Sequence, residues 1–150
     1  MFHHKWFFQG KCTRIIDGQT ALIWIDLGFN IWKKVKVKFN RIRMKAYAPA
    51  LENQATEINN LINYLEQNLR GKQVYCQIYK KKDRLGFNKY FAEMFIQPEN
   101  LPMRLVDINR DISNSNRIDG LVNFNNLLVS QGFSSYIQFN KKPMSNERTS

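Results

Sequence analysis

Acidic residues are scarce in this chain: 12 of its 150 residues are aspartate or glutamate, against 23 lysines and arginines. The resulting net charge of +11 predicts attraction to nucleic acid, to an anionic membrane or to an acidic protein, without choosing among them. Long apolar runs are also absent, and none is long enough to span a membrane. A hydrophobic content of 43% nevertheless indicates a globular domain with a single core.

Cysteine is almost absent as well, with Cys12 and Cys76 as the only two. Both fall in predicted strands, and we interpret them as free thiols in a reducing compartment, with a bridge between them left open. The first ten residues contain too short an apolar stretch for a secretory signal. These features predict an intracellular protein, and they leave cytoplasm, nucleus, organelle matrix and virion open.

We expect the fold to be organised around the segment 32–49, whose first half shows strict alternation of apolar and basic residues. A period of two residues is typical of a strand with one face buried and the other in solvent. The buried face is predicted to hold Val35, Val37 and Phe39, and the solvent face Lys34, Lys36 and Lys38.

The alternation reverses after Asn40, so that Arg41 and Arg43 continue the face that held valine and phenylalanine. An arginine on an inward face is costly unless an anionic group meets it. Two interpretations stay open here. Either a β-bulge leaves both arginines in solvent, or the inner face of the strand passes from the core into an anion-binding cleft.

Periodicity and turn signals predict five strands and two helices along the chain. The strands are expected at residues 6–16, 20–27, 31–44, 72–79 and 87–96, and the helices at residues 53–69 and 122–130. The first three strands should form an antiparallel meander whose first turn is Asp17-Gly18. Residues 80–86 are predicted to be a charged hairpin loop, and residues 133–139 a closing strand or irregular segment.

This order of elements predicts a mainly β (α+β) fold, a five-stranded Greek-key barrel of the OB type with two to three helices. One domain is expected over residues 1–140, and a polar tail over residues 141–150. A long insertion at about 97–121 interrupts the domain and is interpreted as a functional or assembly segment.

Five short motifs, in the right order, resemble those of the staphylococcal-nuclease-like, or thermonuclease, family. They lie between about residues 11 and 136, at residues 15–20, 43–50, 69–74, 83–87 and 122–132. The first resembles the Ile-Asp-Gly turn of the family, and the second its Arg-to-Pro segment. Family members are OB barrels, so the resemblance implies the fold that the element order predicts.

The family cleaves phosphodiesters with calcium, two arginines and a glutamate, and the matching positions here are Asp17, Gln19, Arg43, Ala50 and Phe87. Calcium requires hard oxygen ligands, mainly carboxylates, and Gln19 stands where the family has a ligand aspartate. Ala50 replaces the glutamate, and Phe87 replaces the second arginine. The resemblance therefore implies a degenerate site with no catalytic residue, no metal and no cofactor, the family calcium site being lost.

Arg43 alone, or together with Arg41, matches the first arginine of the family site. Lys89 lies on the same predicted strand face as Phe87, but an ammonium group lacks the bidentate fork of a guanidinium. Asp17 is interpreted as a structural residue that binds turn amides, and Asn123 as the N-cap of the following helix.

Three functions remain open. The first is a non-catalytic structural or interaction subunit of a larger assembly, such as a viral capsid, a ribonucleoprotein or an organelle complex, in contact with other protein subunits. The second is an OB module that binds single-stranded nucleic acid, and the third is a residual calcium-dependent nuclease. Nucleic acid is predicted to contact Lys34, Lys36, Lys38, Arg41, Arg43, Lys80, Lys81 and Lys82. Trp6, Trp24 and Trp32 are interpreted as core aromatics rather than as stacking platforms.

Overall fold

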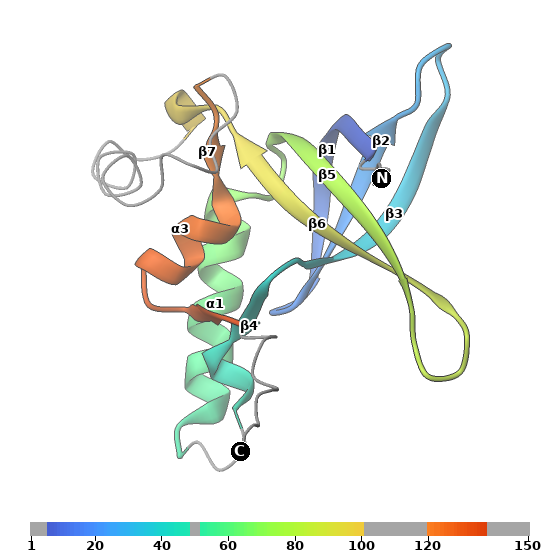
Figure 1. Cartoon of the computed structure of the whole chain (residues 1–150). Helices are drawn as coiled ribbons and strands as arrows, with labels where there is room; N and C mark the ends of the chain where they lie inside the picture. Colours follow the sequence, from blue (N-terminus) through green and yellow to red (C-terminus); the bar gives the residue numbers. More distant parts are fainter. Residues whose placement is uncertain (1–5, 49–51, 101–119, 138–150) are drawn as a thin grey trace, which may run out of the picture.

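The computed structural model describes residues 6–48, 52–100 and 120–137. Within them the fold is mainly β, with a closed five-stranded barrel and two α-helices that lie side by side next to it (Figure 1). Ala50, residues 101–119 of the predicted insertion and the predicted tail at 141–150 lie outside the described residues. No helix in the described ranges is long and apolar enough to cross a membrane.

The barrel strands are β1 (Trp6–Asp17), β2 (Thr20–Asp26), β3 (Trp32–Phe39), β5 (Gln73–Lys82) and β6 (Asn88–Ile96). They are hydrogen-bonded in the order β3-β2-β1-β5-β6, and a short parallel pairing of β3 with β6 closes the barrel. The predicted meander of β1, β2 and β3 is confirmed, since both of its pairings are antiparallel. The mainly β barrel is thus confirmed, and it is consistent with the OB type.

Three shorter strands lie outside the barrel. The strands β4 (Ile42–Met44) and β8 (Ser134–Tyr136) pair with each other, and β7 (Val122–Asn123) pairs with the end of β6. Two short 3-10 helices, η1 (Lys45–Tyr47) and η2 (Pro98–Asn100), complete the described elements.

The organising segment is confirmed in its first half, because Val37 and Phe39 are buried and Val35 is half-buried. The prediction of one continuous strand over 31–44 is wrong. The chain turns directly after β3, where Arg41 takes a φ of 70°, and β4 then leaves the barrel. This turn, rather than a bulge within one strand, produces the phase reversal seen in the sequence.

The predicted loop at 80–86 is also shorter than expected. Lys80, Lys81 and Lys82 belong to β5 and pair with Tyr90, Lys89 and Asn88 of β6. Charged residues therefore extend the β5–β6 ladder beyond the barrel, and the turn itself begins at Asp83.

Helix α1 (Gln54–Asn68) buries Leu61 and Leu65, as its 3.6-residue periodicity predicts. Helix α3 (Phe124–Ser130) is shorter than predicted, because residues 122–123 form β7 instead. Its N-cap is confirmed: the Asn123 side chain accepts a hydrogen bond from the Asn126 amide at 3.1 Å. The core lies inside the barrel and continues between the barrel and the two helices.

Gly10 occupies the point where β1 changes partners, since it pairs with both Ile25 of β2 and Val74 of β5. A Cβ atom at this position would lie 2.7 Å from the carbonyl oxygen of Trp24. Such a contact with backbone cannot be relieved by a side-chain movement, so β1 can approach β2 this closely only with glycine here.

Cys12 and Cys76 are buried free thiols, as predicted. Burial raises the pKa of Cys12 to about 11 and that of Cys76 to about 12. Only the thiolate is nucleophilic, so we expect neither cysteine to react with iodoacetamide at about pH 8 in the native protein, and both to react in urea. Mass spectrometry of the labelled protein measures this. Rapid labelling of the native protein would contradict the burial.

The same pKa shifts have a consequence for stability. The unfolded thiols ionise near their ordinary pKa of 9.0, whereas the folded thiols stay protonated. Stability should therefore fall as the pH rises above about 9, because the unfolded chain loses protons first.

Candidate nucleic-acid interface

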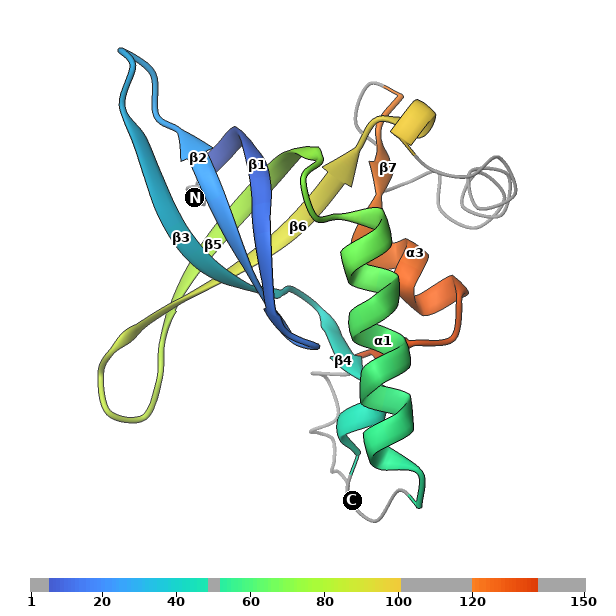
Figure 2. The ribbon, with the colours of Figure 1, turned by 180° about the vertical axis from the view of Figure 1, so that it is seen from behind.

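The seam that closes the barrel is short. The strands β3 and β6 pair at Lys38–Phe91 and Phe39–Ala92 and then diverge. Strand β3 continues with β2 into one hairpin, and β6 continues with β5 into another, so that two separate arms extend from the barrel (Figures 1 and 2). Between the arms lies a groove with a volume of about 780 Å³.

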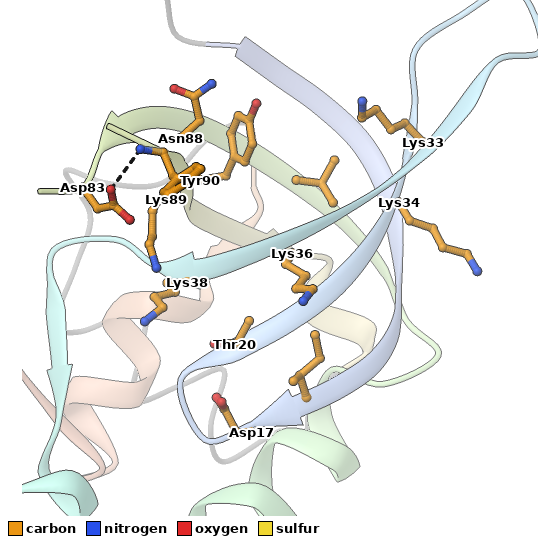
Figure 3. A pocket seen from close by; sticks show the side chains of 13 residues that line it. Asp17, Thr20, Lys33, Lys34, Lys36, Lys38, Asp83, Asn88, Lys89 and Tyr90 are labelled. Carbon is orange, nitrogen blue, oxygen red and sulfur yellow. Dashed lines mark hydrogen bonds between the residues drawn. The ribbon is translucent and has the colours of Figure 1, made fainter. Parts of the chain in front are cut away.

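Lysine dominates this cationic groove. It is lined by Lys33, Lys34, Lys36 and Lys38 of β3 and by Lys89 of β6, together with Ile16, Asp17, Thr20, Val35, Asp83, Phe87, Asn88 and Tyr90. Five lysines against two aspartates leave a clear positive excess. Figure 3 shows Lys38 and Lys89 converging from the two strands, with Lys36 next along β3.

The two aspartates are already engaged in turns. Asp17 Oδ1 accepts a hydrogen bond from the Gln19 amide at 2.8 Å, which confirms its predicted structural role. Asp83 Oδ1 accepts from the amides of Leu85 and Phe87, both at 2.9 Å. In the part of the chain that the structure describes, the five groove lysines form no salt bridge. Their charges are thus available to an external anion.

Aromatic side chains accompany the lysines. Phe87 is exposed and Tyr90 half-buried where they line the groove. Trp24 does not line the groove, but its ring centroid lies 4.9 Å from the ammonium group of Lys34, which does. Trp24 and Trp32 are exposed, so their interpretation as core aromatics is wrong, while the Trp6 side chain lies outside the described residues.

Arg41 has a partner within the fold. Its Nε donates to Glu93 Oε2 at 2.6 Å, and its Nη2 donates to Glu93 Oε1 at 2.9 Å and to Asn126 Oδ1 at 2.8 Å. The hydrogen bonds to Glu93, together with its negative charge, raise the pKa of Arg41 above its ordinary value. Glu93 of β6 therefore supplies the anionic group that an inward-facing arginine requires. For this reason we do not include Arg41 among the residues that contact nucleic acid.

Glu93 is the centre of this buried network, with 4% of its surface exposed. It also accepts hydrogen bonds from Asn40 Nδ2 at 3.0 Å and from Asn123 Nδ2 at 3.2 Å. Asn125 Nδ2 donates to the carbonyl oxygens of Asn40 and Ala92. The network ties β6, the β3–β4 turn and α3 together. The only feature of the sequence that indicates this network is a glutamate within the apolar run of β6, and we did not predict a role for it.

The positions implied by the nuclease resemblance fall in two adjoining places. Asp17 and Phe87 line the cationic groove, whereas Gln19 and Arg43 line a cavity of about 150 Å³. Lys38 lines both. No group of three or more His, Cys, Asp or Glu that could hold a metal occurs in the described ranges. The loss of the calcium site stays a prediction.

The structure thus gathers only part of the predicted interface. Lys34, Lys36 and Lys38 line the groove, while Lys80, Lys81 and Lys82 lie beside it on β5. Lys81 Nζ lies 4.7 Å from the ring centroid of Phe91. Lys33 and Lys89 were not among the predicted contacts. Lys33 lies out of phase with the predicted solvent face of β3, and Lys89 reaches the groove only because β6 closes the barrel against β3.

A comparison with models of known protein families gives no match for this chain, and neither does a comparison with curated proteins. The class that the structure defines is therefore a closed, mainly β barrel with a cationic groove. Membership of the staphylococcal-nuclease-like family stays a prediction from the sequence motifs.

Proposed function

We propose that this protein is a non-catalytic binding module that holds single-stranded nucleic acid in the cationic groove. The observation that carries the proposal is a row of lysines, without salt-bridge partners in the described residues, along a groove of about 780 Å³. Lysines in such a groove release counterions from a nucleic-acid backbone, and this release supplies most of the sequence-independent affinity.

The aromatic side chains favour a single strand over a duplex. Phe87 and Tyr90 lie in the groove, and Trp24 lies beside it under Lys34. A single strand presents base faces that can stack on such rings, whereas a duplex keeps its base faces inside the helix. The proposal therefore assigns phosphates to the lysines and bases to the aromatic rings.

Fluorescence anisotropy with a labelled oligonucleotide of about 15 nucleotides tests the proposal at about 50 and about 200 mM salt. We expect the single strand to bind more tightly than a duplex of the same sequence. The logarithm of its affinity should fall with the logarithm of salt with a slope of up to about −3.5 if all five lysines contact phosphates. Equal affinity for the duplex, or no salt dependence, would argue against the groove as a single-strand site.

A structural or interaction subunit of a larger assembly is the second candidate. It is supported by large hydrophobic side chains that are exposed in the described residues, among them Phe29 and Leu85 at the ends of the two arms. The two functions are compatible, because a subunit can bind nucleic acid in its groove and protein elsewhere.

The resemblance to the nuclease family supports a binding role without cleavage, since Gln19 and Phe87 replace a calcium ligand and an arginine of that family. We expect the purified protein to leave single-stranded and duplex DNA and RNA intact, both with calcium and with a chelator. Gel electrophoresis after prolonged incubation measures this. Calcium-dependent cleavage that disappears in Arg43→Ala would show a working nuclease and refute the pseudo-nuclease interpretation.

A further inference from the structure

The β2–β3 arm ends in large apolar side chains that face solvent. Phe29 at the turn is 95% exposed, and it is flanked by Leu27, Ile31 and Trp32, which are exposed as well. The arm reaches beyond the barrel, because β1 pairs with β2 only as far as Ile25, and Figures 1 and 2 show the hairpin projecting outward. These four residues are called the apolar tip below.

The apolar tip has a defined conformation. The Leu27 amide donates to the Ile31 carbonyl at 2.8 Å, and the Ile31 amide donates to the Gly28 carbonyl at 2.9 Å. The Gly28 amide donates to Asp26 Oδ1 at 2.8 Å. Phe29 itself has a φ of 54°, a left-handed conformation that is costly for a bulky residue. The backbone of Phe29 is strained and its side chain is exposed, and no contact in the described residues offsets either cost. We therefore infer that Phe29 acts by contacting a partner.

Cationic side chains lie directly behind the apolar tip. Lys33 and Lys34 follow Trp32 along β3, and both are exposed. The acidic group of this region, Asp26, is half-buried and accepts the hydrogen bond from Gly28. Along the arm, the order is therefore phenylalanine and aliphatic residues, then tryptophan, then lysine.

We propose that the apolar tip inserts into the interface of an anionic lipid bilayer, with Phe29 at the acyl boundary and Lys33 and Lys34 at the headgroups. Apolar residues at the deepest point, tryptophan at headgroup level and lysine behind it match the polarity gradient of such an interface. Anionic headgroups complement the two lysines and the net charge of +11.

The shape of the arm favours a membrane over a protein partner. A convex, projecting tip requires a matching pocket on a protein, whereas lipids rearrange around it. The two arms extend on the side of the barrel away from the helices and diverge, the β2–β3 arm upward and the β5–β6 arm downward in both views (Figures 1 and 2). None of the four residues of the apolar tip lines the cationic groove, whereas Lys33 and Lys34 do line it. The two proposals therefore share these lysines, and substitutions at the apolar tip test membrane binding separately from nucleic-acid binding.

Sedimentation with phosphatidylcholine vesicles, with and without about 30% phosphatidylserine, tests the proposal. The full chain should bind the anionic vesicles and bind the neutral ones much more weakly. Phe29→Asp should lower the partition coefficient at least about tenfold, since it withdraws a large apolar side chain from the acyl boundary. Lys33→Gln should lower it about fivefold.

Leu85→Asp is the matched control, because it makes the same kind of change at a leucine that is 80% exposed on the other arm. This variant should bind vesicles like the unchanged protein. Phe29→Asp should also keep its affinity for single-stranded oligonucleotide, which shows that the barrel and the groove are intact.

Depth can be measured directly with Trp6→Phe/Trp24→Phe, which leaves Trp32 as the single tryptophan. Lipids brominated near the headgroup should quench its emission in the anionic vesicles. Unchanged vesicle binding by Phe29→Asp, or an equal loss in Leu85→Asp, would overturn the proposal, because binding would then follow overall charge or general hydrophobicity. Failure to bind any vesicle would also overturn it and would point to a protein as the occupant of the apolar tip.

Discussion

The triple substitution Lys36→Glu/Lys38→Glu/Lys89→Glu should weaken binding of a single-stranded oligonucleotide by at least about 100-fold at about 0.1 M salt. These lysines line the groove near its closed end, where β3 and β6 meet, and Lys38 and Lys89 converge there (Figure 3). Each phosphate contact with a single strand contributes about fivefold at this salt concentration. Anisotropy titrations at several salt concentrations should also show the slope reduced by about 2.

The control is a triple charge reversal of equal size elsewhere on the barrel and its neighbour η1. Lys11, Arg14 and Lys45 are exposed, and none of them lines the groove. Their replacement by glutamate changes the net charge by the same amount. A difference in affinity between the two triple variants therefore reports where the charges lie, and not how large the net charge is. A similar loss of affinity in both triple variants would mean that the overall charge, and not the groove, binds the nucleic acid.

Glu93→Ala should lower the free energy of unfolding by about 3–5 kcal/mol. The substitution removes the acceptor of both arginine bonds and of the bonds from Asn40 and Asn123. Since Glu93 is 4% exposed, water replaces these bonds poorly, and the half-buried Arg41 loses its anionic partner. Urea denaturation followed by circular dichroism measures the change.

An exposed ion pair provides the comparison for Glu93. Arg70 Nη1 lies 3.1 Å from Glu66 Oε1 near the end of α1, where the Arg70 side chain is 57% exposed and the Glu66 side chain 33%. Glu66→Ala removes the same kind of contact, and it should cost less than about 1 kcal/mol. If Glu93→Ala proved equally mild, the network would not be what holds β6, the β3–β4 turn and α3 together.

Local periodicity predicted much of the framework. The alternation from Val35 to Phe39 identified the inward face of β3, and the spacing of Leu61 and Leu65 identified the buried face of α1. The cap at Asn123 and the turn at Asp17 were also predictable, because each hydrogen bond joins residues two or three positions apart. Patterns of this kind depend on neighbours in the chain, so they can be read without knowing the fold.

Periodicity failed where both faces of a strand carry apolar residues. The run around Trp24 is apolar throughout, so alternation does not tell which residues point inward. Pairing of β2 with β1 and β3 places Ile23 and Ile25 in the core and leaves Trp24 exposed. The same reasoning applies to Trp32, which lies at the outer end of β3, beyond the part that the barrel covers.

The basic character of the protein, the barrel class and most element positions could be predicted from the amino-acid sequence, because they follow from composition and from short-range patterns. Which charges act together depends on tertiary contacts. Arg41 meets a carboxylate 52 residues away on β6, and Lys38 comes beside Lys89 from a different strand. Both pairings depend on closure of the barrel between β3 and β6, a long-range contact that no local pattern encodes.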